Sequence, residues 1–518
     1  MHWADVEAER IAARSKAKIT VSTGITPSGP IHVGNMREII TGYLLYRALL
    51  DRGIDARLIY SGDTIDPLRK VYPFLPKEYE NYIGKSLSDI PCPCGRHSSY
   101  AEHFLEPFLN SLNMLGIEPE VILSHESYRN GIFAEATKLA LDHRDVIKEI
   151  LERISGRELA KDWWPYSAQC EACGSLNTKI KGYEHPFVEY TCECGHEGKA
   201  DIRKGQGKMP WRVEWPAKWF AYGVDVEPFG KDHGAAGGSY DTGSEMARKV
   251  FGMEPPHPVL YEWIELKGKG AMSSSTGVAI AASDILAIVP PEVMIFYIAR
   301  YQPAKHLEFD PGLGILNLVE EYDRFERIYY GLEKAELEDK EEDWRRAYEL
   351  SQTRGVREKM PVQVSYRHLV NVVQIAPTFE GVLEILGRTG EIKDIDEDDM
   401  KNLRDRVERV RRWLETFAPE SVKFSITESL TGEYDAEEKA FAKALADLLS
   451  SCEWNGEAIH NSIRQAAEES ELPIKRAFRA LYRAFIGKEK GPRLGYFFST
   501  MERDFVLGRL KKLNEVEN

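Results

Sequence analysis

The chain has 518 residues, and at roughly 150 residues per domain this length predicts three to four domains. Its 43% apolar and 10% aromatic residues are ordinary for a globular protein, and 68 Lys and Arg against 83 Asp and Glu give a net charge of −15, which excludes a globally basic coat for nucleic acid. No run of about 18 apolar residues predicts a membrane span, and residues 1–18 lack the apolar core of a secretory signal, so we expect a cytoplasmic protein with no membrane partner.

The first predicted elements alternate between strand and helix. Residues 18–22 are rich in β-branched side chains and predict a buried strand, and a turn rich in Gly and Pro follows over residues 23–34. Residues 35–50 have helical periodicity, and residues 56–60 predict a second strand. This order opens a doubly wound parallel sheet, so we expect an α/β fold of Rossmann type whose first half is residues 1–65.

The alternation is lost over residues 66–210, which we interpret as an inserted connective domain that contains zinc ligands and one long helical stretch at 132–154. Residues 211–285 predict the second half of the catalytic domain. They comprise an aromatic-rich segment over 211–229, a loop and helix start near 237–241, and a strand over 258–266.

Beyond residue 285 the pattern is helical. Residues 286–359 predict a helical linker region with an exposed acidic connection over 333–343, and residues 360–518 predict an all-α domain. The stretch 471–518 has 11 Lys and Arg against 6 Asp and Glu. Its interleaved aromatic side chains predict either stacking on unpaired RNA bases or a core stripe beneath a basic face: Phe478, Tyr482, Phe485, Tyr496 and Phe497.

Six of the seven cysteines form close pairs, which in a large intracellular chain indicate metal ligands rather than disulfides. Two turn-embedded knuckles match a zinc ribbon with the ligands Cys170, Cys173, Cys192 and Cys194, and His196 is an alternative ligand. A less regular group predicts a second zinc on Cys92, Cys94, His97 and His103. Four protein ligands close a site, so either zinc would be structural. The alternatives are reduced surface thiols and a structural loop with a core histidine.

The string Gly-Ile-Thr-Pro-Ser-Gly-Pro-Ile-His-Val-Gly-Asn, residues 24–35, lies between the first strand and the first helix. Gly29 and Gly34 permit close approach of the backbone, and a helix N-terminus offers unpaired N–H groups to a triphosphate. His32 and Asn35 lie one helical turn apart and predict contact with one phosphate group. A histidine there can donate a hydrogen bond to charge that develops on the α-phosphate.

A second string, Gly-Ala-Met-Ser-Ser-Ser-Thr-Gly at residues 270–277, is by composition a flexible Ser/Gly loop. Its hydroxyl and backbone N–H groups are also suited to hold a pyrophosphate. Lys267 and Lys269 stand just upstream and add positive charge.

Together the two strings resemble the signatures of class I aminoacyl-tRNA synthetases, with His32 to Asn35 at the first signature and Ala271 to Ser275 at the second. The strings Gly-Ile-Thr-Pro-Ser-Gly, Ser-Ser-Tyr-Ala-Glu-His-Phe (98–104), Gly-Lys-Asp-His (230–233) and Phe-Ile-Gly-Lys-Glu-Lys-Gly-Pro-Arg-Leu (485–494) resemble the archaeal-type class I lysyl-tRNA synthetase family. The chain departs from the family at Ala271, Ser274 and Thr276, where the second signature has lysine. Lys267 or Lys269 would substitute, or else activation would be slow or absent.

The resemblance implies that the chain activates L-lysine with ATP and Mg²⁺ to lysyl-adenylate, then esterifies the 3′ end of tRNA(Lys), as a monomer. The residues implied to act in catalysis are His32, Asn35, Ser273, Ser274 and Ser275. The residues implied to contact ATP are Pro27, Ser28, Gly29, His32, Gly34, Asn35, Gly230, Asp232, His233, Ala271, Met272, Ser273 and Ser275.

A pocket for lysine must pair the buried ammonium with an acidic or aromatic group. Gly24 and Thr26 are expected to border the amino acid. The candidates for its other contacts are Asp63, Trp219, Asp232 and Tyr240, with Glu38 and Asp66 as further acidic candidates. The resemblance implies that the helical region 286–359 contacts the tRNA stem and that the all-α domain, residues 360–518, binds the anticodon.

Four alternatives are weighed against this expectation. A glutamyl-tRNA synthetase would want an arginine early in the first signature, and residues 24–28 have none. A cysteinyl-tRNA synthetase would need a catalytic zinc with an open coordination position, and the two predicted zinc sites of this chain are closed. The altered second signature also suits a non-catalytic tRNA-binding paralogue, whereas a small-molecule nucleotidyltransferase would leave the helical C-terminal region without a role.

Overall fold

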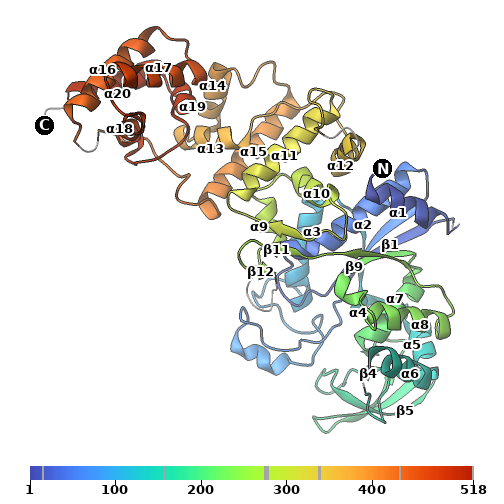
Figure 1. Cartoon of the computed structure of the whole chain (residues 1–518). Helices are drawn as coiled ribbons and strands as arrows, with labels where there is room; N and C mark the ends of the chain where they lie inside the picture. The colour runs from blue at the N-terminus through green and yellow to red at the C-terminus, as the bar shows by residue number, and fades with distance from the viewer. Residues whose placement is uncertain (15–16, 157, 273–278, 337–339, 431–432, 516–518) are drawn as a thin grey trace. The chain divides into compact units, whose positions relative to one another are not determined.

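The computed structural model describes residues 1–14, 17–156, 158–272, 279–336, 340–430 and 433–515 (Figure 1). The chain forms two compact units. Unit 1 comprises Met1–Leu286, Pro291–Phe309 and Gly331–Val356, and unit 2 comprises Ala287–Pro290, Asp310–Tyr330 and Arg357–Asn518. The predicted linker region, residues 286–359, is thus divided between the two units. Within the described ranges, none of the helices is both long and apolar enough to cross a membrane.

A five-stranded parallel sheet forms the centre of unit 1, in the order β10-β9-β1-β2-β3. Its strands are β1 (Ile19–Ile25), β2 (Ala56–Gly62), β3 (Glu120–Leu123), β9 (Val226–Gly230) and β10 (His257–Tyr261). β1 pairs with β2 from Ile19↔Ala56 to Ile25↔Gly62. β-Branched and other apolar residues alternate sides along these strands, which suits a sheet covered on both faces. The predicted Rossmann-type order is therefore confirmed.

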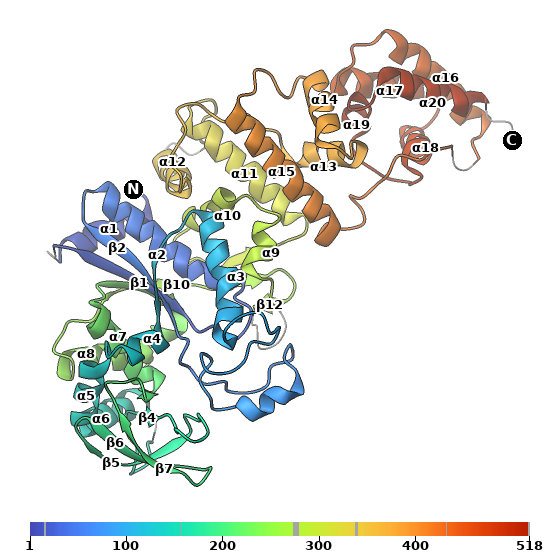
Figure 2. The ribbon, with the colours of Figure 1, turned by 180° about the vertical axis from the view of Figure 1, so that it is seen from behind.

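Helices cover both faces of this sheet. α2 (Val33–Asp51) packs on β1, β2 and β9. On the opposite face, Ile59 and Phe229 pack with Trp215 of α7 (Trp211–Tyr222) and Met246 of α8 (Ser239–Lys249). Figures 1 and 2 show α2 on one side of the sheet and α7 and α8 on the other. The helix start predicted near residue 239 is confirmed.

The segment 66–210 contributes both to the sheet and to structures beyond it. α3 (Tyr100–Leu115) and β3 complete the first half of the parallel sheet, so residue 66 lies inside the nucleotide-type fold rather than at its edge. The helical stretch predicted over 132–154 consists of two helices, α5 (Ala134–Asp142) and α6 (Arg144–Ser155), with His143 between them. The other elements of the segment are η1 (Lys77–Tyr82), α4 (Ser124–Arg129), β4 (Ser167–Ala168), β5 (Thr178–Glu184), β6 (Phe187–Cys192), β7 (Glu197–Asp201) and β8 (Gly207–Lys208).

The predicted strand over 258–266 is two strands in different sheets, because β10 joins the parallel sheet and β11 (Ile264–Leu266) pairs with β12 (Gly270–Ala271) and β13 (Leu307–Phe309). A short 3₁₀ helix, η2 (Lys231–His233), directly follows β9. The remaining elements of unit 1 are α1 (Trp3–Ala12), α9 (Ala282–Leu286), α10 (Pro291–Ala299) and α12 (Glu341–Ser351).

Unit 2 is helical in its described residues, as predicted for the C-terminal region. Its helices are α11 (Gly314–Tyr329), α13 (Tyr366–Ile375), α14 (Phe379–Thr389), α15 (Glu397–Thr416), α16 (Ala436–Ser451), α17 (Gly456–Glu469), α18 (Ile474–Ile486), α19 (Leu494–Ser499) and α20 (Arg503–Glu515). Phe485 and Phe497 lie in the core formed by α16 to α20, whereas the Tyr496 side chain is 49% exposed. Phe485 and Phe497 therefore belong to the predicted core stripe, and the stacking role of the exposed Tyr496 stays a prediction.

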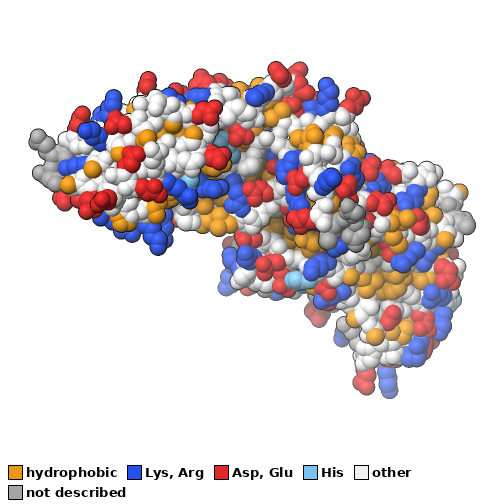
Figure 3. Space-filling view, turned by 45° about the horizontal axis from the view of Figure 1, so that its top comes forward, with side chains coloured by type: hydrophobic (Ala, Val, Ile, Leu, Met, Phe, Trp, Pro, Cys, Tyr) orange, Lys and Arg blue, Asp and Glu red, His pale blue; other side chains and the backbone are white. Residues whose placement is uncertain are grey.

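On the face shown in Figure 3, Lys and Arg side chains lie interspersed with Asp and Glu side chains. The charges of both signs are distributed over the whole of this face rather than gathered in one large patch. Any RNA contact here must therefore depend on local groups, because the net charge of −15 disfavours long-range attraction of a polyanion.

Candidate active site

The parallel sheet has a topological switch point between β1 and β9. Later strands are added on the β2 side in the first half of the chain and on the β9 side in the second half. Val21 of β1 is level with Val226 of β9, so β1 and β9 end together at Ile25 and Gly230. In open α/β sheets, ligands bind in the crevice outside the carboxyl ends of the strands at such a point. The residues 26–32 and 231–238 leave the sheet there.

His32 is the N-cap residue of α2. The His32 backbone N–H donates to Asn35 Oδ1 across 3.2 Å, and the Asn35 N–H donates to the His32 carbonyl across 2.9 Å. This reciprocal pairing fixes both residues at the start of the helix. The side-chain Nδ2 of Asn35 remains available as a hydrogen-bond donor. It lies beside the backbone N–H groups that the start of a helix leaves unpaired.

The His32 imidazole is neutral at pH 7, because burial lowers its pKa to about 4. Its Nδ1 has no hydrogen-bond partner among the described residues. A Cβ at Gly34 would lie 2.9 Å from ring atoms Cε1 and Nδ1. Glycine is therefore required at position 34 if the ring is to lie against the first turn of α2.

The first signature string contacts the segment that follows the second string, and Met272 of the second string lies near its glycine. The Val33 N–H donates to the Ile280 carbonyl across 3.0 Å, and the Ala282 N–H donates to the Ile31 carbonyl across 3.2 Å. The Met272 Cε atom lies 3.6 Å from the position that a Cβ on Gly34 would take. Met272 therefore lies close to Gly34 in the first turn of α2, where His32 is the N-cap residue. The predicted catalytic residues Ser273, Ser274 and Ser275 lie outside the described residues.

Lys267 and Lys269 lie at the turn between β11 and β12, where Leu266 pairs with Gly270 and Glu265 with Ala271. Both lysine side chains are exposed. The hairpin therefore presents them immediately before the second signature, where the family pattern would have a lysine at Ala271.

The residues 26–30 pack against α3. The Tyr100 hydroxyl donates to the Ser28 carbonyl across 2.7 Å, and the Ser28 N–H donates to the Thr26 carbonyl across 2.8 Å. Pro27 and Gly29 are buried. This loop is thereby held at the end of β1, where the sequence predicted contact with ATP.

Gly230, Asp232 and His233 follow β9 at the same edge. The Asp232 side chain is exposed, and the His233 ring lies 5.2 Å from the ring of Trp211 and 5.6 Å from that of Trp215. Burial lowers the pKa of His233, so its imidazole is a neutral group. The structure brings these three predicted residues to the switch point.

The predicted acidic residues Asp63 and Asp66 already have cationic partners. Lys218 Nζ bonds to Asp63 Oδ1, and Lys208 Nζ bonds to Asp66 Oδ1. Glu214 lies between the two lysines, with its Oε2 2.5 Å from Lys208 Nζ. The Thr26 hydroxyl donates to Asp66 Oδ2 across 3.1 Å, which connects this buried network to the first signature loop.

Asp63 and Asp66 are therefore structural anchors rather than open partners for a substrate ammonium. Sequence reasoning missed Lys208, Glu214 and Lys218 because they are separated from the two aspartates by more than 140 residues. Glu214 and Lys218 could have been noticed as charged residues within the otherwise apolar, aromatic-rich helix α7, whereas Lys208 lies in β8.

Glu38 differs from the two aspartates. Its Oε1 accepts the Gly24 N–H across 2.7 Å, and its Oε2 accepts the Tyr261 hydroxyl across 2.7 Å. No Lys or Arg side chain of the described residues lies in ion-pair contact with it. Burial raises the pKa of Glu38 to about 8, so the carboxyl group is largely neutral at pH 7. Tyr261 was not predicted from the sequence.

Trp219 and Tyr240 were predicted to contact the amino acid, and both are engaged within the protein. The Trp219 indole is fully buried and its Nε1–H donates to Glu227. The Tyr240 hydroxyl donates to the Pro256 carbonyl across 2.7 Å, and the two rings lie 5.8 Å apart. The two side chains are therefore packed within the protein next to β9, and their polar groups are already hydrogen-bonded to other residues.

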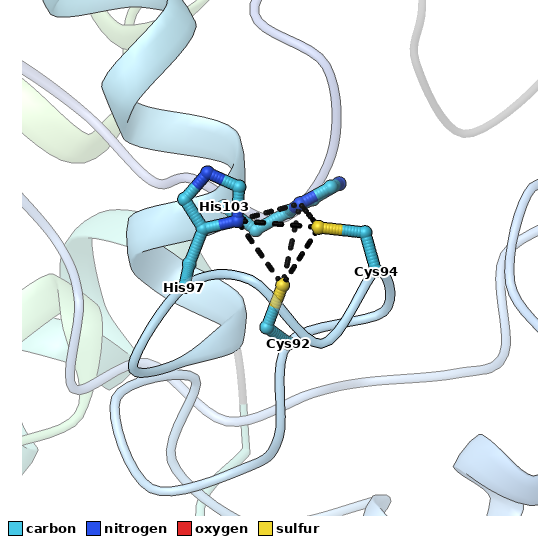
Figure 4. A group of neighbouring side chains, drawn as sticks. All are labelled: Cys92, Cys94, His97 and His103. Carbon is cyan, nitrogen blue, oxygen red and sulfur yellow. Dashed lines mark hydrogen bonds between the residues drawn. The ribbon is translucent and has the colours of Figure 1, made fainter.

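The first Cys/His group has the geometry of a tetrahedral metal site (Figure 4). Cys92 Sγ lies 3.3 Å from Cys94 Sγ, 3.2 Å from His97 Nδ1 and 3.4 Å from His103 Nδ1. A tetrahedron with zinc–ligand bonds of about 2.0–2.3 Å has edges of about 3.3–3.8 Å. The His97 Nε2 atom faces Glu106 across 2.8 Å, the outer carboxylate contact that orients many histidine ligands.

The second group comprises the four predicted ribbon cysteines. Cys170 Sγ lies 3.7 Å from Cys194 Sγ, and Cys173 Sγ lies 3.6 Å from Cys192 Sγ. All four sulfur atoms lie within 4.8 Å of one another. His196 is not part of this group, because its Nε2 faces Glu171 across 2.9 Å. Both groups therefore fit a closed site for zinc, with four thiolate or imidazole donors each.

The comparisons with known proteins agree with this geometry. A family model described as tRNA synthetases class I (K) matches residues 1–354, and one described as anticodon binding domain matches residues 379–514. The chain is 46% identical over 517 residues to a lysine–tRNA ligase of Thermoplasma acidophilum, covering 99% of each chain. It is 44% identical to those of Picrophilus torridus over 514 residues and Archaeoglobus fulgidus over 513 residues, again covering 99% of each chain. The chain therefore belongs to the class I (K) family of tRNA synthetases.

Proposed function

We propose that the chain activates L-lysine with ATP and transfers the lysyl group to the 3′ end of tRNA(Lys). The observation that carries this function is that the first signature string lies at the β1–β9 switch point, where residues 31–33 hydrogen-bond with residues 280–282, a few positions after the second string. The full-length identity of 44–46% to lysine–tRNA ligases points to the same activity.

In the first reaction a carboxylate oxygen of lysine attacks the α-phosphorus of ATP, and the bond from that phosphorus to the bridging oxygen breaks as pyrophosphate leaves. The neutral His32 ring donates its N–H to an α-phosphate oxygen as negative charge develops there. Asn35 and the first N–H groups of α2 hold a neighbouring phosphate. Mg²⁺, when bound with ATP, would supply further charge neutralisation at the triphosphate.

Pro27, Ser28 and Gly29 border the triphosphate, and Gly230, Asp232 and His233 border the adenosine from the β9 side. Met272 contributes a contact at the first turn of α2. The exposed Lys269, with Lys267, provides the positive charge that the family pattern places in the second signature. Both lysines are suited to the departing pyrophosphate because their hairpin leads directly into that string.

Glu38 is the acidic candidate that best suits the lysine ammonium, and Gly24 and Thr26 border the rest of the amino acid. The carboxyl group of Glu38 is held by the Gly24 N–H and the Tyr261 hydroxyl, which orient it at the strand ends. Binding of an ammonium there would convert the carboxyl group to a carboxylate and form a charge-assisted pair. A glutamate substrate would instead meet an acidic group, which disfavours the glutamyl alternative.

Zinc at the two Cys/His groups would be structural. Each group has four protein donors, so a bound ion would have no open position for a substrate. This arrangement disfavours the cysteinyl alternative. In this proposal the ions hold the loops of the segment 66–210 in place around α3 and the β5–β7 sheet.

The test is ATP–pyrophosphate exchange in the presence of tRNA(Lys), with each of the twenty amino acids in turn. Exchange that depends on lysine supports the proposal, whereas exchange with glutamate or cysteine but not lysine overturns it. Binding of tRNA without any exchange would instead identify a non-catalytic paralogue, the alternative motivated by the missing signature lysines.

A further inference from the structure

The first Cys/His group, called here the first metal site, is built onto the start of α3. His103 lies in the first turn of this helix, and its Nδ1 is 3.4 Å from Cys92 Sγ and 3.3 Å from Cys94 Sγ (Figure 4). Glu106, further along α3, faces Nε2 of the ligand His97 across 2.8 Å. An ion bound by the four ligands would therefore join the preceding loop to the first two turns of α3.

The loop that carries the other three ligands has little hydrophobic support. Residues 91–98 belong to no strand or helix, and residues 93–98 are all exposed or half-buried. The apolar cluster that surrounds Tyr100 includes none of the residues 93–98. Because apolar burial is the usual source of the free energy that orders a segment, metal binding is left as the main source of order for this loop.

Tyr100, the first residue of α3, links this helix to the first signature loop. Its side chain is fully buried, with its ring 4.8 Å from that of Phe104. Its hydroxyl donates to the Ser28 carbonyl across 2.7 Å. Because Tyr100 lies between the ligands His97 and His103 in the sequence, a displacement of these ligands would also move the hydroxyl group.

The hydrogen bond to Ser28 also sets the direction of a backbone donor in the loop. The Ser28 carbonyl and the Gly29 N–H belong to one planar peptide, which is trans, so the N–H points away from Tyr100. The Gly29 N–H has no hydrogen-bond acceptor among the described residues. Gly29 is one of the residues proposed to border the triphosphate, and a backbone N–H with a fixed direction is suited to a phosphate oxygen.

The second group of cysteines lacks a direct link of this kind. The segment that carries it contacts residues 84–89, where the Leu176 N–H donates to the Gly84 carbonyl across 2.8 Å and Gln169 donates to Asp89 across 2.6 Å. In the part of the chain that the structure describes, no hydrogen bond joins residues 167–201 to the loop 26–30. The two groups therefore provide a comparison in which only one is coupled directly to the first signature.

We propose that the first metal site sets the affinity for ATP, because an ion there holds the start of α3 in place and with it the bond from Tyr100 to the Ser28 carbonyl. Tyr100 is a positioning residue, since it acts through the loop and not on the substrate itself. The inference rests on the proposed function, because it assumes that residues 26–30 border ATP. A zinc ion that only stabilised the fold would leave the ATP affinity of the folded chain unchanged.

The test measures ATP binding to the full-length chain by isothermal titration calorimetry without lysine, together with the zinc content of the same samples. Cys94→Ser and Tyr100→Phe are each expected to weaken ATP binding about 3- to 10-fold, the equivalent of one lost hydrogen bond. Only Cys94→Ser should lower the zinc content. The double variant should bind ATP no more weakly than Cys94→Ser, because both changes act through the same hydrogen bond.

Cys194→Ser is the matched control, because Cys194 is an exposed ligand like Cys94 but belongs to the second group. This variant should also lose one zinc ion and have a lower melting temperature, yet bind ATP like the parent. In pyrophosphate exchange, Tyr100→Phe should raise the KM for ATP and keep the kcat at saturating ATP, since it removes a contact that holds the loop in both the ground state and the transition state.

Parent-like ATP affinity of Cys94→Ser would overturn the proposal, as would losses that multiply in the double variant or an equal loss in Cys194→Ser. If Cys94→Ser does not fold, chelation replaces it. The parent should then lose ATP affinity on chelation and regain it with added Zn²⁺, whereas Tyr100→Phe should not respond, and an equal response of the two would overturn the proposal.

The proposed function fails separately, if the parent binds ATP in this zinc-dependent manner but supports no lysine-dependent pyrophosphate exchange. Circular dichroism of each variant establishes that a loss of ATP affinity is not a loss of folding.

Discussion

Tyr261 and Glu38 are joined by a hydrogen bond of 2.7 Å from the phenolic hydroxyl to Oε2, although they lie 223 residues apart in the chain. The bond brings the end of β10 to the second turn of α2. Burial raises the pKa of Glu38 to about 8, so its carboxyl group is largely neutral at pH 7. The group lies at the edge of the sheet where β1 and β9 also end. The ionisation of that group gives the first prediction.

Lysine binding should release a proton and strengthen as pH rises toward 8. If the ammonium pairs with ionised Glu38, affinity should increase about tenfold per pH unit between pH 6 and 7, because the carboxyl group must first lose its proton. Isothermal titration calorimetry in buffers of different ionisation enthalpy measures the affinity for lysine and the number of protons released on binding. Glu38→Gln should bind lysine weakly, with no such pH dependence. A parent affinity that is flat across this range would contradict the assignment.

The same group predicts how stability varies with pH. The folded chain retains the Glu38 proton up to a pKa of about 8, whereas the unfolded chain loses it near 4.5. Between these values the native state binds more protons, so the contribution of Glu38 to the free energy of unfolding falls as pH rises from about 4.5 to 8. Glu38→Gln should lack this decrease in denaturant titrations at pH 5 and pH 8.

Replacing His32 with Ala should slow adenylate formation by about 10²-fold or more, since the donor to the α-phosphate is lost. The affinity for tRNA(Lys) should be retained, because the ring acts at the nucleotide. Pyrophosphate exchange with lysine and tRNA present, together with tRNA binding by anisotropy, measures the two effects. Unchanged exchange kinetics would remove His32 from its proposed role.

Gly34→Ala should impair activation although the residue carries no functional group. The new Cβ would lie 2.9 Å from the His32 ring, which must then turn away from its position on α2. A shift of about 1 Å in a catalytic group reduces rates by about 10²-fold. The matched control is Gly387→Ala in α14, where a Cβ meets nothing within 4 Å. This control should gain about 0.5–1 kcal/mol of stability and keep full activity. Equal activity of the two variants would contradict the prediction.

Metal analysis of the purified chain should find about two zinc ions, one for each Cys/His group. Cys92→Ser and Cys173→Ser should each remove one ion and lower the melting temperature, because zinc binding contributes to folding. Cys452→Ser, at the cysteine outside both groups, is the control and should leave the zinc content unchanged. Metal-free protein with an unaltered melting curve would reject both sites.

The double variant Lys267→Ala/Lys269→Ala should slow lysine activation about tenfold or more, since the pair replaces the charge that the second signature lacks. Lys179→Ala, at an exposed position of β5, is the control and should behave like the parent. Pyrophosphate exchange at saturating lysine separates the rate from the affinity. An active double variant would show that the departing pyrophosphate is neutralised elsewhere.

The features that could be predicted from the sequence are local ones. The β1 to α2 turn and the cysteine knuckles are defined by residues a few positions apart, so the fold class, the family and the two Cys/His groups could be predicted directly. The break at His143 between α5 and α6 was missed because the apolar periodicity continues across it.

The pairing of charges could not be predicted in this way. Asp63 and Asp66 were candidates for contact with the substrate, but in the structure they form ion pairs with Lys218 and Lys208, which are distant in the sequence. Tyr261 carries no sequence signal either, since its hydroxyl reaches Glu38 only when β10 and α2 are brought together by the sheet. Such contacts depend on topology, and spacing along the chain does not encode them.

The position of Lys208 has a consequence for any attempt to shorten this protein. Its ammonium neutralises both Asp66 and Glu214, and it arrives at the very end of the cysteine-containing segment. Excising residues 66–210 would remove Lys208 together with Asp66 and would leave the buried Glu214 with Lys218, 3.9 Å away, which already pairs with Asp63. One lysine would then face two buried carboxylates, so a shortened catalytic domain would need a substitute cation beside Glu214, or a neutral residue in its place.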